Sequence, residues 1–386
     1  MPIYTDTDWD VDFKQIENAG FGTELLPETF DNVRGKTVAS RLGTKSAKLG
    51  IFHVRRLKNY SGVVIFGSVA HGLVDGYGVF AFANRWAEIS KHMHERPTEK
   101  VSARVFSHDR AIYKDYRQEG TSSLDDILLK LTSTSSNAVT RFLSSLPTDK
   151  SQYLMTLFGK PTKTVCSSFH ISTQALKKLQ HSVQALAPPN IRYTTNDVLT
   201  SVLTMTIGKA IQENNARKQA KSLFKSMCSP LNSDNDNDEP EDTMLLIPTN
   251  IRLRSNNPNG RSFVGNMVFP RYVLCPSALT QAGLDPENVL AIATPVREVI
   301  SSTNKTYIGQ FNHLINSEPD MYLRLNMCYY KYKSLLVVTN VSKFDQYKLD
   351  FGAGIPHLIR PSLQSFVNAI LVMSSHPDIG GYEVVL

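Results

Sequence analysis

The chain has 386 residues, of which 41% are hydrophobic and 20% are charged, a composition typical of a soluble globular protein with one large or two medium domains. Its formal net charge of +7 at pH 7 favours an anionic partner. The basic residues are scattered and form no dense stripe, which argues against nucleic acid and favours a phosphorylated small molecule.

The N-terminal residues and the cysteines indicate the compartment. Residues 1–13 are acidic and lack the basic start and apolar stretch of a secretory signal, and the sequence has no transmembrane run. The cysteines lie far apart without a C-x-x-C spacing, so neither a disulfide framework nor a zinc site is indicated. They are Cys166, Cys228, Cys275 and Cys328. We therefore expect a cytoplasmic protein with free thiols and no metal.

The first strong pattern in the chain is a strand followed by a helix. Residues 60–70, YSGVVIFGSVA, are rich in β-branched side chains and predict a mostly buried strand. A helix is expected next, because apolar residues recur at the spacing of one helical face. These residues are Val79, Phe82, Ala83, Trp86 and Ile89. The helix should fade before Pro97, and a polar, mixed stretch follows over 100–163.

The second half alternates strand and helix patterns. Helices are predicted over 172–186, 192–211 and 359–373, and strands over 164–172, 243–254, 263–274, 321–332, 334–342 and 382–386. Thr194 with Asp197 three residues later resembles a capping box at the start of the second helix. Residues 229–243 carry acids, amides and proline, which indicates a disordered surface loop. The whole pattern predicts an α/β protein with mixed sheets.

His71 and Asp75 are the candidate reactive pair. A histidine at the end of a strand is suited to general base work, because the following loop can hold it in a cleft and an unperturbed imidazole titrates close to neutral pH. Asp75, four residues on, could fix the loop through backbone donors or an arginine. The spacing alone leaves a second interpretation open, a polar loop pair without catalysis.

A second motif favours the catalytic interpretation of His71. Residues 350–354 read DFGAG, and together with His71 and Asp75 they resemble the H-x-x-x-D and D-F-G-W-G signatures of the BAHD acyltransferases, in the family's order and at a large separation. Between the signatures, YTTNDVL, PTNIRLR and FVGN resemble the family's S-S-F-E-x-L, D-G-R-x-R and Y-x-G-N segments. The resemblance runs from the strand before His71 to Leu386. It implies a two-lobed fold like that of chloramphenicol acetyltransferase, with mixed sheets and flanking helices.

The resemblance also implies a reaction and its reactive residues. An acyl group would pass from acyl-CoA to the hydroxyl or amine of a small molecule, with His71 deprotonating the acceptor and no permanently bound cofactor. Thr339, at the position of the threonine in the family's T-x-W segment, would donate to the oxyanion. Thr195 and Lys343 are the residues we expect to contact acyl-CoA.

The remaining motif residues are expected to support the site. Asp75 would brace the loop by pairing with Arg252. Asp350, Gly352 and Gly354 would shape the fold near the CoA channel, where glycine permits close approach of the backbone.

Several positions of the chain depart from the family pattern. Ala353, Val341 and Asn196 stand where the family has aromatic residues, which places the chain nearer to divergent, fungal-type members. Peptide-synthetase condensation domains carry a doubled histidine, whereas Ala70 precedes His71 here. A kinase is excluded, because no H-R-D loop accompanies the D-F-G triplet.

The domain organisation follows from the motif order. We expect an N-terminal lobe over 1–100 that carries His71, a crossover linker over 101–163, and a C-terminal lobe over 164–386 that carries the DFGAG segment. Family members have about twice as many residues before the histidine, so the N-terminal lobe is expected to be incomplete. This leaves an alternative function open, in which the chain is a truncated and inactive family member that binds a ligand or partner. A monomer is expected in either case.

Overall fold

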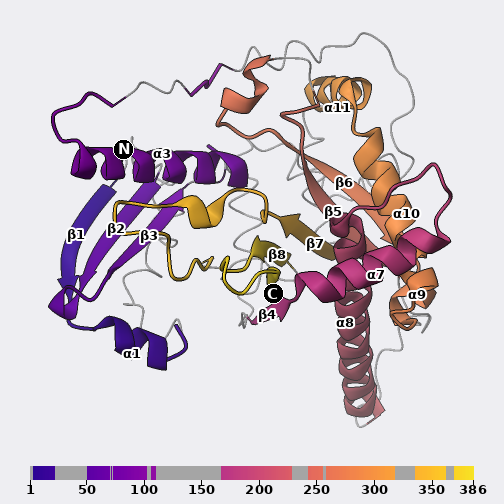
Figure 1. Ribbon diagram of the computed structural model, residues 1–386. Helices are drawn as coiled ribbons and strands as arrows, with labels where there is room; N and C mark the ends of the chain where they lie inside the picture. The colour runs from indigo at the N-terminus through magenta and orange to yellow at the C-terminus, as the bar shows by residue number, and fades with distance from the viewer. Residues whose placement is uncertain are drawn as a thin grey trace. The chain divides into compact units, whose positions relative to one another are not determined.

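The computed structural model describes residues 3–21, 50–69, 71, 73–101, 106–109, 167–227, 242–254, 258–317, 335–361 and 369–386. The chain divides into two compact units. The first comprises Met1–Phe82 with Val264–Asn266, and the second comprises Ala83–Phe263 with Met267–Leu386. Each unit has its own β-sheet, drawn in Figure 1. Helix α3 (Gly76–Glu95) begins in the first unit and ends in the second.

The first unit contains a small mixed sheet. It consists of β1 (Ile3–Trp9), β2 (Gly50–Leu57) and β3 (Val63–Val69), with the short helix α1 (Phe13–Asn18) after β1 and a 3-10 turn, η4 (Lys58–Tyr60), after β2. β1 runs parallel to β2, and β2 runs antiparallel to β3. The rings of Phe52 and Phe82, 5.4 Å apart, join β2 to the start of α3. The strand predicted over 60–70 and the helix after it are present, but the expectation that this strand is mostly buried is wrong. No residue of β3 is fully buried, and Val63 and Ile65 are 57% and 37% exposed.

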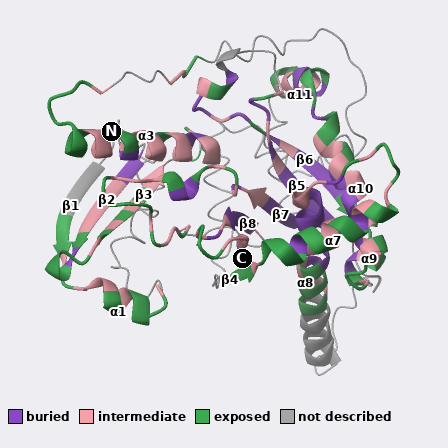
Figure 2. Cartoon of the chain, in the orientation of Figure 1, coloured by how far each residue is buried: buried purple, intermediate pink, exposed green. Residues whose placement is uncertain are grey.

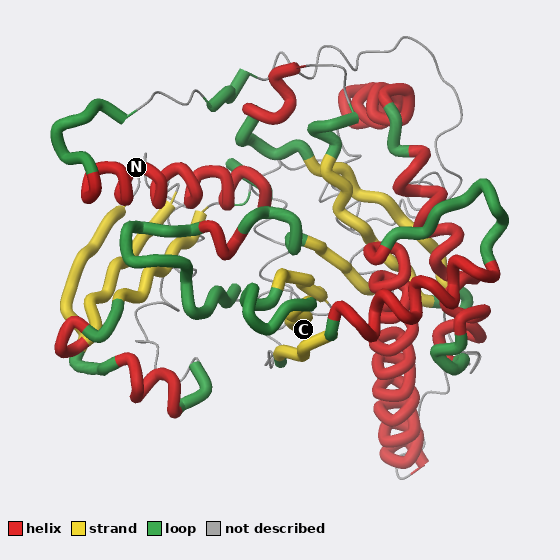
Figure 3. Tube along the Cα trace, in the orientation of Figure 1, coloured by secondary structure: helices red, strands yellow, loops and turns green. Residues whose placement is uncertain are grey.

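The second unit is built on a six-stranded sheet in the order β4-β9-β8-β7-β5-β6. The strands are β4 (Ser168–Ile171), β5 (Thr243–Asn250), β6 (Val268–Cys275), β7 (Leu335–Asn340), β8 (Ala369–Ser374) and β9 (Tyr382–Val385). The β5-β7 and β7-β8 pairs are parallel and the other pairs are antiparallel. The predicted mixed sheets are therefore confirmed, and Figure 3 shows the strands in yellow.

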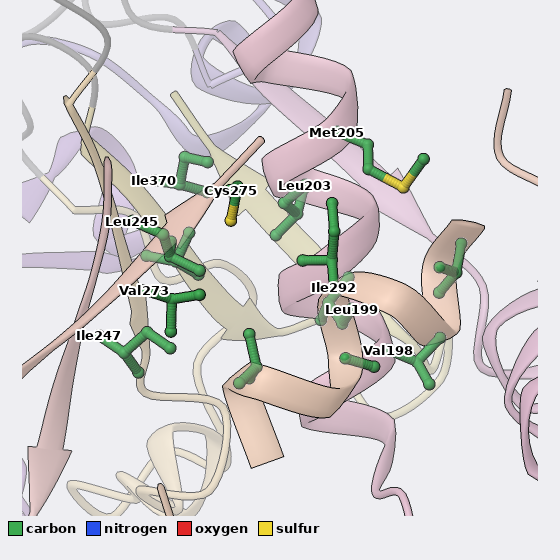
Figure 4. Close-up of a cluster of buried hydrophobic side chains, with 14 of the residues drawn as sticks. Val198, Leu199, Leu203, Met205, Leu245, Ile247, Val273, Cys275, Ile292 and Ile370 are labelled. Carbon is green, nitrogen blue, oxygen red and sulfur yellow. The ribbon is translucent and has the colours of Figure 1, made fainter. Parts of the chain in front are cut away.

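Helices cover both faces of this larger sheet. They are α7 (Thr173–Leu186), α8 (Thr195–Met227), α9 (Ser277–Gln281), α10 (Pro286–Ser302) and α11 (Lys305–Ser317). Side chains alternate between the two faces of a strand. Leu245, labelled in Figure 4, and Leu336 accordingly belong to a buried cluster with residues of α7, α8 and α10. Leu246 and Leu335 instead pack with residues of α11. Figure 2 shows β5 and β6 as largely buried.

The predicted helix over 359–373 is wrong at its C-terminal end. Residues 369–374 form β8, a strand paired on both sides, with β7 and with β9. A short apolar run such as AILVM has no alternation, because a central strand is covered on both faces, and periodicity cannot distinguish it from a buried helix. These residues form a strand because they pair with β7 and β9 in the middle of the mixed sheet, which the local sequence does not reveal.

Several predictions fall largely or wholly outside the described residues. They are the crossover over 101–163, the loop over 229–243 and the strand over 321–332. Among the cysteines, Cys275 is described and is a free, buried thiol, as expected. Burial raises its pKa to about 12, so this thiol is a poor nucleophile at neutral pH.

Candidate active site

His71 lies in the loop between β3 and α3. The strand ends at Val69 and the helix begins at Gly76, so the loop is short and both of its ends are anchored. The side-chain amide of Asn266 donates a hydrogen bond of 2.9 Å to the backbone carbonyl of His71. The His71 side chain is exposed. A fixed backbone with an accessible ring is what a general base requires.

Asp75 starts helix α3. Its side chain is only 2% exposed, and Oδ1 accepts a hydrogen bond of 3.0 Å from the backbone N–H of Gly78. Its backbone carbonyl accepts from the N–H of Val79. An aspartate at the N-cap satisfies a free helical N–H and places negative charge at the positive end of the helix dipole. Asp75 therefore fixes the end of the His71 loop.

Gly78, which the sequence analysis did not single out, allows a close backbone approach. A Cβ atom at this position would lie 2.1 Å from the carbonyl oxygen of Val264, far inside van der Waals contact. Only glycine fits there without moving the backbone. The first turn of α3 thus packs against the segment Val264–Asn266. Asn266 of this segment also donates the hydrogen bond to the His71 carbonyl.

Arg252 holds the residue that precedes this segment. It is 2% exposed, and its Nε donates a hydrogen bond of 2.9 Å to the carbonyl of Phe263, the residue before Val264. Asn250 Oδ1 accepts from the Arg252 backbone N–H at 3.0 Å, which orders the turn after β5. The ion pair between Asp75 and Arg252 joins residues of different units and stays a prediction.

Thr339 and Thr195 lie on neighbouring segments of the second unit. Thr339 is half-buried on β7, and strand alternation places it on the face of Leu335, away from α8. Asn340 lies on the other face, and its Nδ2 donates a hydrogen bond of 2.7 Å to Asn196 Oδ1 in the first turn of α8. This contact brings the end of β7 next to Thr195.

The turn after β7 is ordered by the same asparagine. Asn340 Oδ1 accepts from the backbone N–H of Ser342 at 3.0 Å and from its hydroxyl at 2.7 Å. Lys343 follows on this turn and is exposed to solvent. The structure therefore places Lys343 on the segment that adjoins the start of α8. The Asn196–Asn340 contact was not predicted.

A partly buried ion pair between Arg297 and Asp197 fixes the start of α8. Asp197 is fully buried, and its Oδ2 accepts from the backbone N–H of Thr194 at 2.7 Å and from Arg297 Nε at 2.9 Å; Arg297 Nη2 makes a second contact with Oδ2. Of the two hydrogen bonds of the predicted capping box, the one from the Thr194 backbone N–H to the Asp197 carboxylate is present. The Thr194 hydroxyl donates to Asp197 and does not accept from the helix. Arg297, on α10, was not predicted.

The DFGAG segment is a tight loop organised around Asp350. Oδ1 accepts hydrogen bonds of 2.9 Å from the backbone N–H groups of both Gly352 and Gly354, and Oδ2 accepts one of 2.5 Å from Lys91 Nζ. Both glycines have positive φ, +107° and +98°, which L-residues rarely adopt. The two glycines and the aspartate therefore form one structural unit.

Asp350 should make stability depend on pH in the acid range. The hydrogen bond from Lys91, followed by the one from the Gly352 N–H, lowers the pKa of Asp350 from 3.8 to about 2. Because the folded-state pKa is depressed, the stabilisation is present above about pH 4 and is lost as the pH falls toward 2. We expect Asp350→Asn to lower the thermal midpoint by about 2–4 °C at pH 6–8. The difference should shrink below about pH 4, as followed by circular dichroism.

Asp345→Asn is the matched control for this experiment. The Asp345 carboxylate also pairs with a lysine, Lys348 at 3.0 Å, but both side chains are well exposed. Exposed ion pairs contribute little to stability. A midpoint difference for Asp350→Asn that stays constant down to pH 2, or one that is equal to that of Asp345→Asn, would contradict the assignment.

Within the described residues, no group of three or more histidine, cysteine or acidic side chains is arranged to hold a metal ion. Among the same residues, no helix is long and apolar enough to cross a membrane.

Solved structures resemble the chain in fold at low sequence identity. Vinorine synthase is 16% identical with a TM-score of 0.52, and the match covers 89% of this chain and 63% of that one. TRI101 of F. sporotrichioides, complexed with coenzyme A and T-2, is 13% identical with a TM-score of 0.57 over 100% of this chain and 76% of that one. TRI101 of F. graminearum, complexed with coenzyme A and T-2 mycotoxin, is 13% identical with a TM-score of 0.55, and the match covers 100% of this chain and 77% of that one. The chain thus spans less than two thirds of vinorine synthase.

The expected fold class, a two-lobed α/β fold of the chloramphenicol acetyltransferase type with mixed sheets and flanking helices, is confirmed by these neighbours. A search of curated proteins found no match. The model of a family described as the Transferase family matches residues 29–386. The chain therefore belongs to this family, the BAHD acyltransferases.

Proposed function

We propose that the protein transfers an acyl group from acyl-CoA to the hydroxyl or amine of a small molecule, with His71 as the general base. The observation that carries the proposal is the geometry of the His71 loop, in a chain that belongs to the acyltransferase family. Its backbone is held by Asn266 and by the Asp75 cap, while the imidazole stays exposed. Two of the solved relatives were crystallised with coenzyme A, which supports acyl-CoA as the co-substrate.

The proposed reaction is a direct transfer. The His71 imidazole takes the proton from the acceptor as its oxygen or nitrogen attacks the thioester carbonyl, and the Thr339 hydroxyl donates a hydrogen bond to the oxyanion that forms. Collapse of the tetrahedral intermediate breaks the C–S bond, and the proton on His71 passes to the departing CoA sulfur. Atoms and charges balance without an acyl-enzyme.

The other motif residues support this chemistry in the proposal. Asp75 caps α3 and pairs with Arg252, while Asp350, Gly352 and Gly354 maintain the loop that they form. Thr195 and Lys343 contact acyl-CoA. The adjacency of their two segments through Asn196 and Asn340 supports this assignment, as does the solvent exposure of Lys343.

We further propose a cytoplasmic monomer without a permanently bound cofactor, in which residues 101–163 link the lobe that carries His71 to the C-terminal lobe. The alternative, a family member that binds ligands without turnover, draws no support from the comparisons.

The function is tested by a screen for free CoA. Purified protein is incubated with acetyl-CoA and longer acyl-CoA donors, with and without pooled alcohols and amines, and the released thiol is measured with a chromogenic disulfide. We expect CoA release that depends on the acceptor, with an acylated product detected by mass spectrometry. The His71→Ala variant is the control for background hydrolysis. Binding of CoA without acceptor-dependent release from any donor would favour the alternative.

A further inference from the structure

Helix α3 connects the two signature motifs of the sequence. Asp75 caps its N-terminus, directly behind the His71 loop. Its second half, within the second unit, contacts the Asp350–Gly354 loop. The two motifs lie far apart in the sequence, and Lys91 and Asp350, which join the helix to the second motif, are 259 residues apart.

Lys91 makes the polar contact between α3 and the loop. Its ammonium group donates to Asp350 Oδ2 at 2.5 Å, and the two side chains are 41% and 23% exposed. The other carboxylate near Lys91 is that of Glu95, at 3.8 Å. Because Asp350 Oδ1 is occupied by the Gly352 and Gly354 amides, Oδ2 is the oxygen left for α3. Lys91 therefore ties the helix to the residue that organises the loop.

Trp86 makes the apolar contact. Its ring meets that of Phe351 edge to face, with centroids 5.2 Å apart and an angle of 87° between the planes. Such T-shaped pairs are favourable because the positive ring edge meets the negative face. One turn beyond Lys91, the His94 side chain lies beside Gly352, within 3.7 Å of where a Cβ would be. Three consecutive turns of α3 thus contact three consecutive residues of the loop.

The helix between these contacts and the His71 loop is stiff. Residues 79–95 contain no proline or glycine, the usual causes of a kink. Trp86 follows Gly76 by ten residues, about 15 Å along the helix axis. We therefore expect a displacement at Trp86 or Lys91 to be transmitted along the helix to its first turn and to the Asp75 cap.

We propose that Lys91 and Trp86 are positioning residues for His71. By fixing α3 on the Asp350–Phe351 loop they hold its first turn, and hence the His71 loop, in the geometry for proton transfer. This inference rests on the proposed role of His71 as a base. It gives the DFGAG segment a defined task, anchoring one helix, without contact with substrate.

The test is a comparison of Lys91→Ala with Glu95→Gln, which removes the weaker partner of Lys91 and leaves Asp350 in place. Hydrogen exchange measured by mass spectrometry should be faster over residues 71–79 in Lys91→Ala and unchanged in Glu95→Gln. The turnover number kcat should fall about tenfold to a hundredfold, since a displacement of about 1 Å can cost about a hundredfold. The KM for both substrates should stay within about twofold. Lys91→Arg should restore most of kcat.

The outcomes separate positioning from a purely local role. Faster exchange confined to residues 86–95 and 350–354, with 71–79 unchanged, would overturn the proposal, as would a rise in KM at unchanged kcat. If the wild-type protein transfers no acyl group, the proposed function fails, whereas hydrogen exchange still decides whether α3 orders the His71 loop. Lys91→Gln, which keeps a long side chain, replaces the alanine variant if that variant does not fold.

Discussion

His71→Ala is expected to lower kcat by about two to four orders of magnitude, because a positioned general base contributes about that much to catalysis. The fold should be preserved, since the His71 side chain is exposed and the contact with Asn266 uses the backbone carbonyl. Far-UV circular dichroism and the thermal midpoint should therefore match those of the wild-type protein. The measurement is acceptor-dependent release of CoA at saturating donor.

The control for this prediction is His181→Ala, at an exposed histidine on α7. It should leave kcat unchanged. Turnover by His71→Ala at a near-normal rate would end the assignment of His71 as the base, and an equal loss in both variants would point to a general effect on the preparation.

Local patterns predicted the framework of the site well. The β-branched run before His71 and the helix after it are local in the sequence, and both are present in the structure. The same holds for α7, for the strand β4 before it and for the helix α8 after it. The error at 369–374 arose where an apolar run without periodicity became a central strand, which only the surrounding sheet could decide.

Contacts between distant residues could not be predicted in this way. Asn266 lies 195 residues from the carbonyl that it binds, and Asn340 lies 144 residues from Asn196. Neither asparagine stands out by residue type, because an amide side chain is common in loops. Family resemblance pointed to FVGN as a segment, but the task of Asn266 emerged only from the fold.

The glycine at 78 shows the same limit. A glycine in the first turn of a helix usually reads as a weak helix former, with a cost of about 1 kcal/mol relative to alanine. Here its missing Cβ allows the Val264 carbonyl to approach. The requirement for glycine at this position comes from Val264, nearly two hundred residues away, so it cannot be predicted from the local sequence.

Gly78→Ala is accordingly expected to inactivate the protein although alanine is the better helix former. The new Cβ would lie 2.1 Å from the Val264 oxygen, and a backbone carbonyl cannot rotate away as a side chain can. Either α3 or the segment Val264–Asn266 must shift, at a cost of about 1–3 kcal/mol for overpacking. The shift would pull Asn266 from the His71 carbonyl and lower kcat by about a hundredfold or more.

The matched control is Gly208→Ala in helix α8, where the nearest atoms outside the helix's own backbone would be side-chain atoms of Thr243 and Thr280, at 3.2–3.5 Å from the new Cβ. Because these side chains can adjust by a few tenths of an ångström, this variant should change the thermal midpoint little and leave kcat intact. Both variants add one methyl group to a helical glycine, so a difference in activity between them isolates the contact at Val264. Wild-type activity in Gly78→Ala would show that the close approach of α3 to this segment is not needed to place His71, and the account of the site given by Asp75, Gly78 and Asn266 would fail.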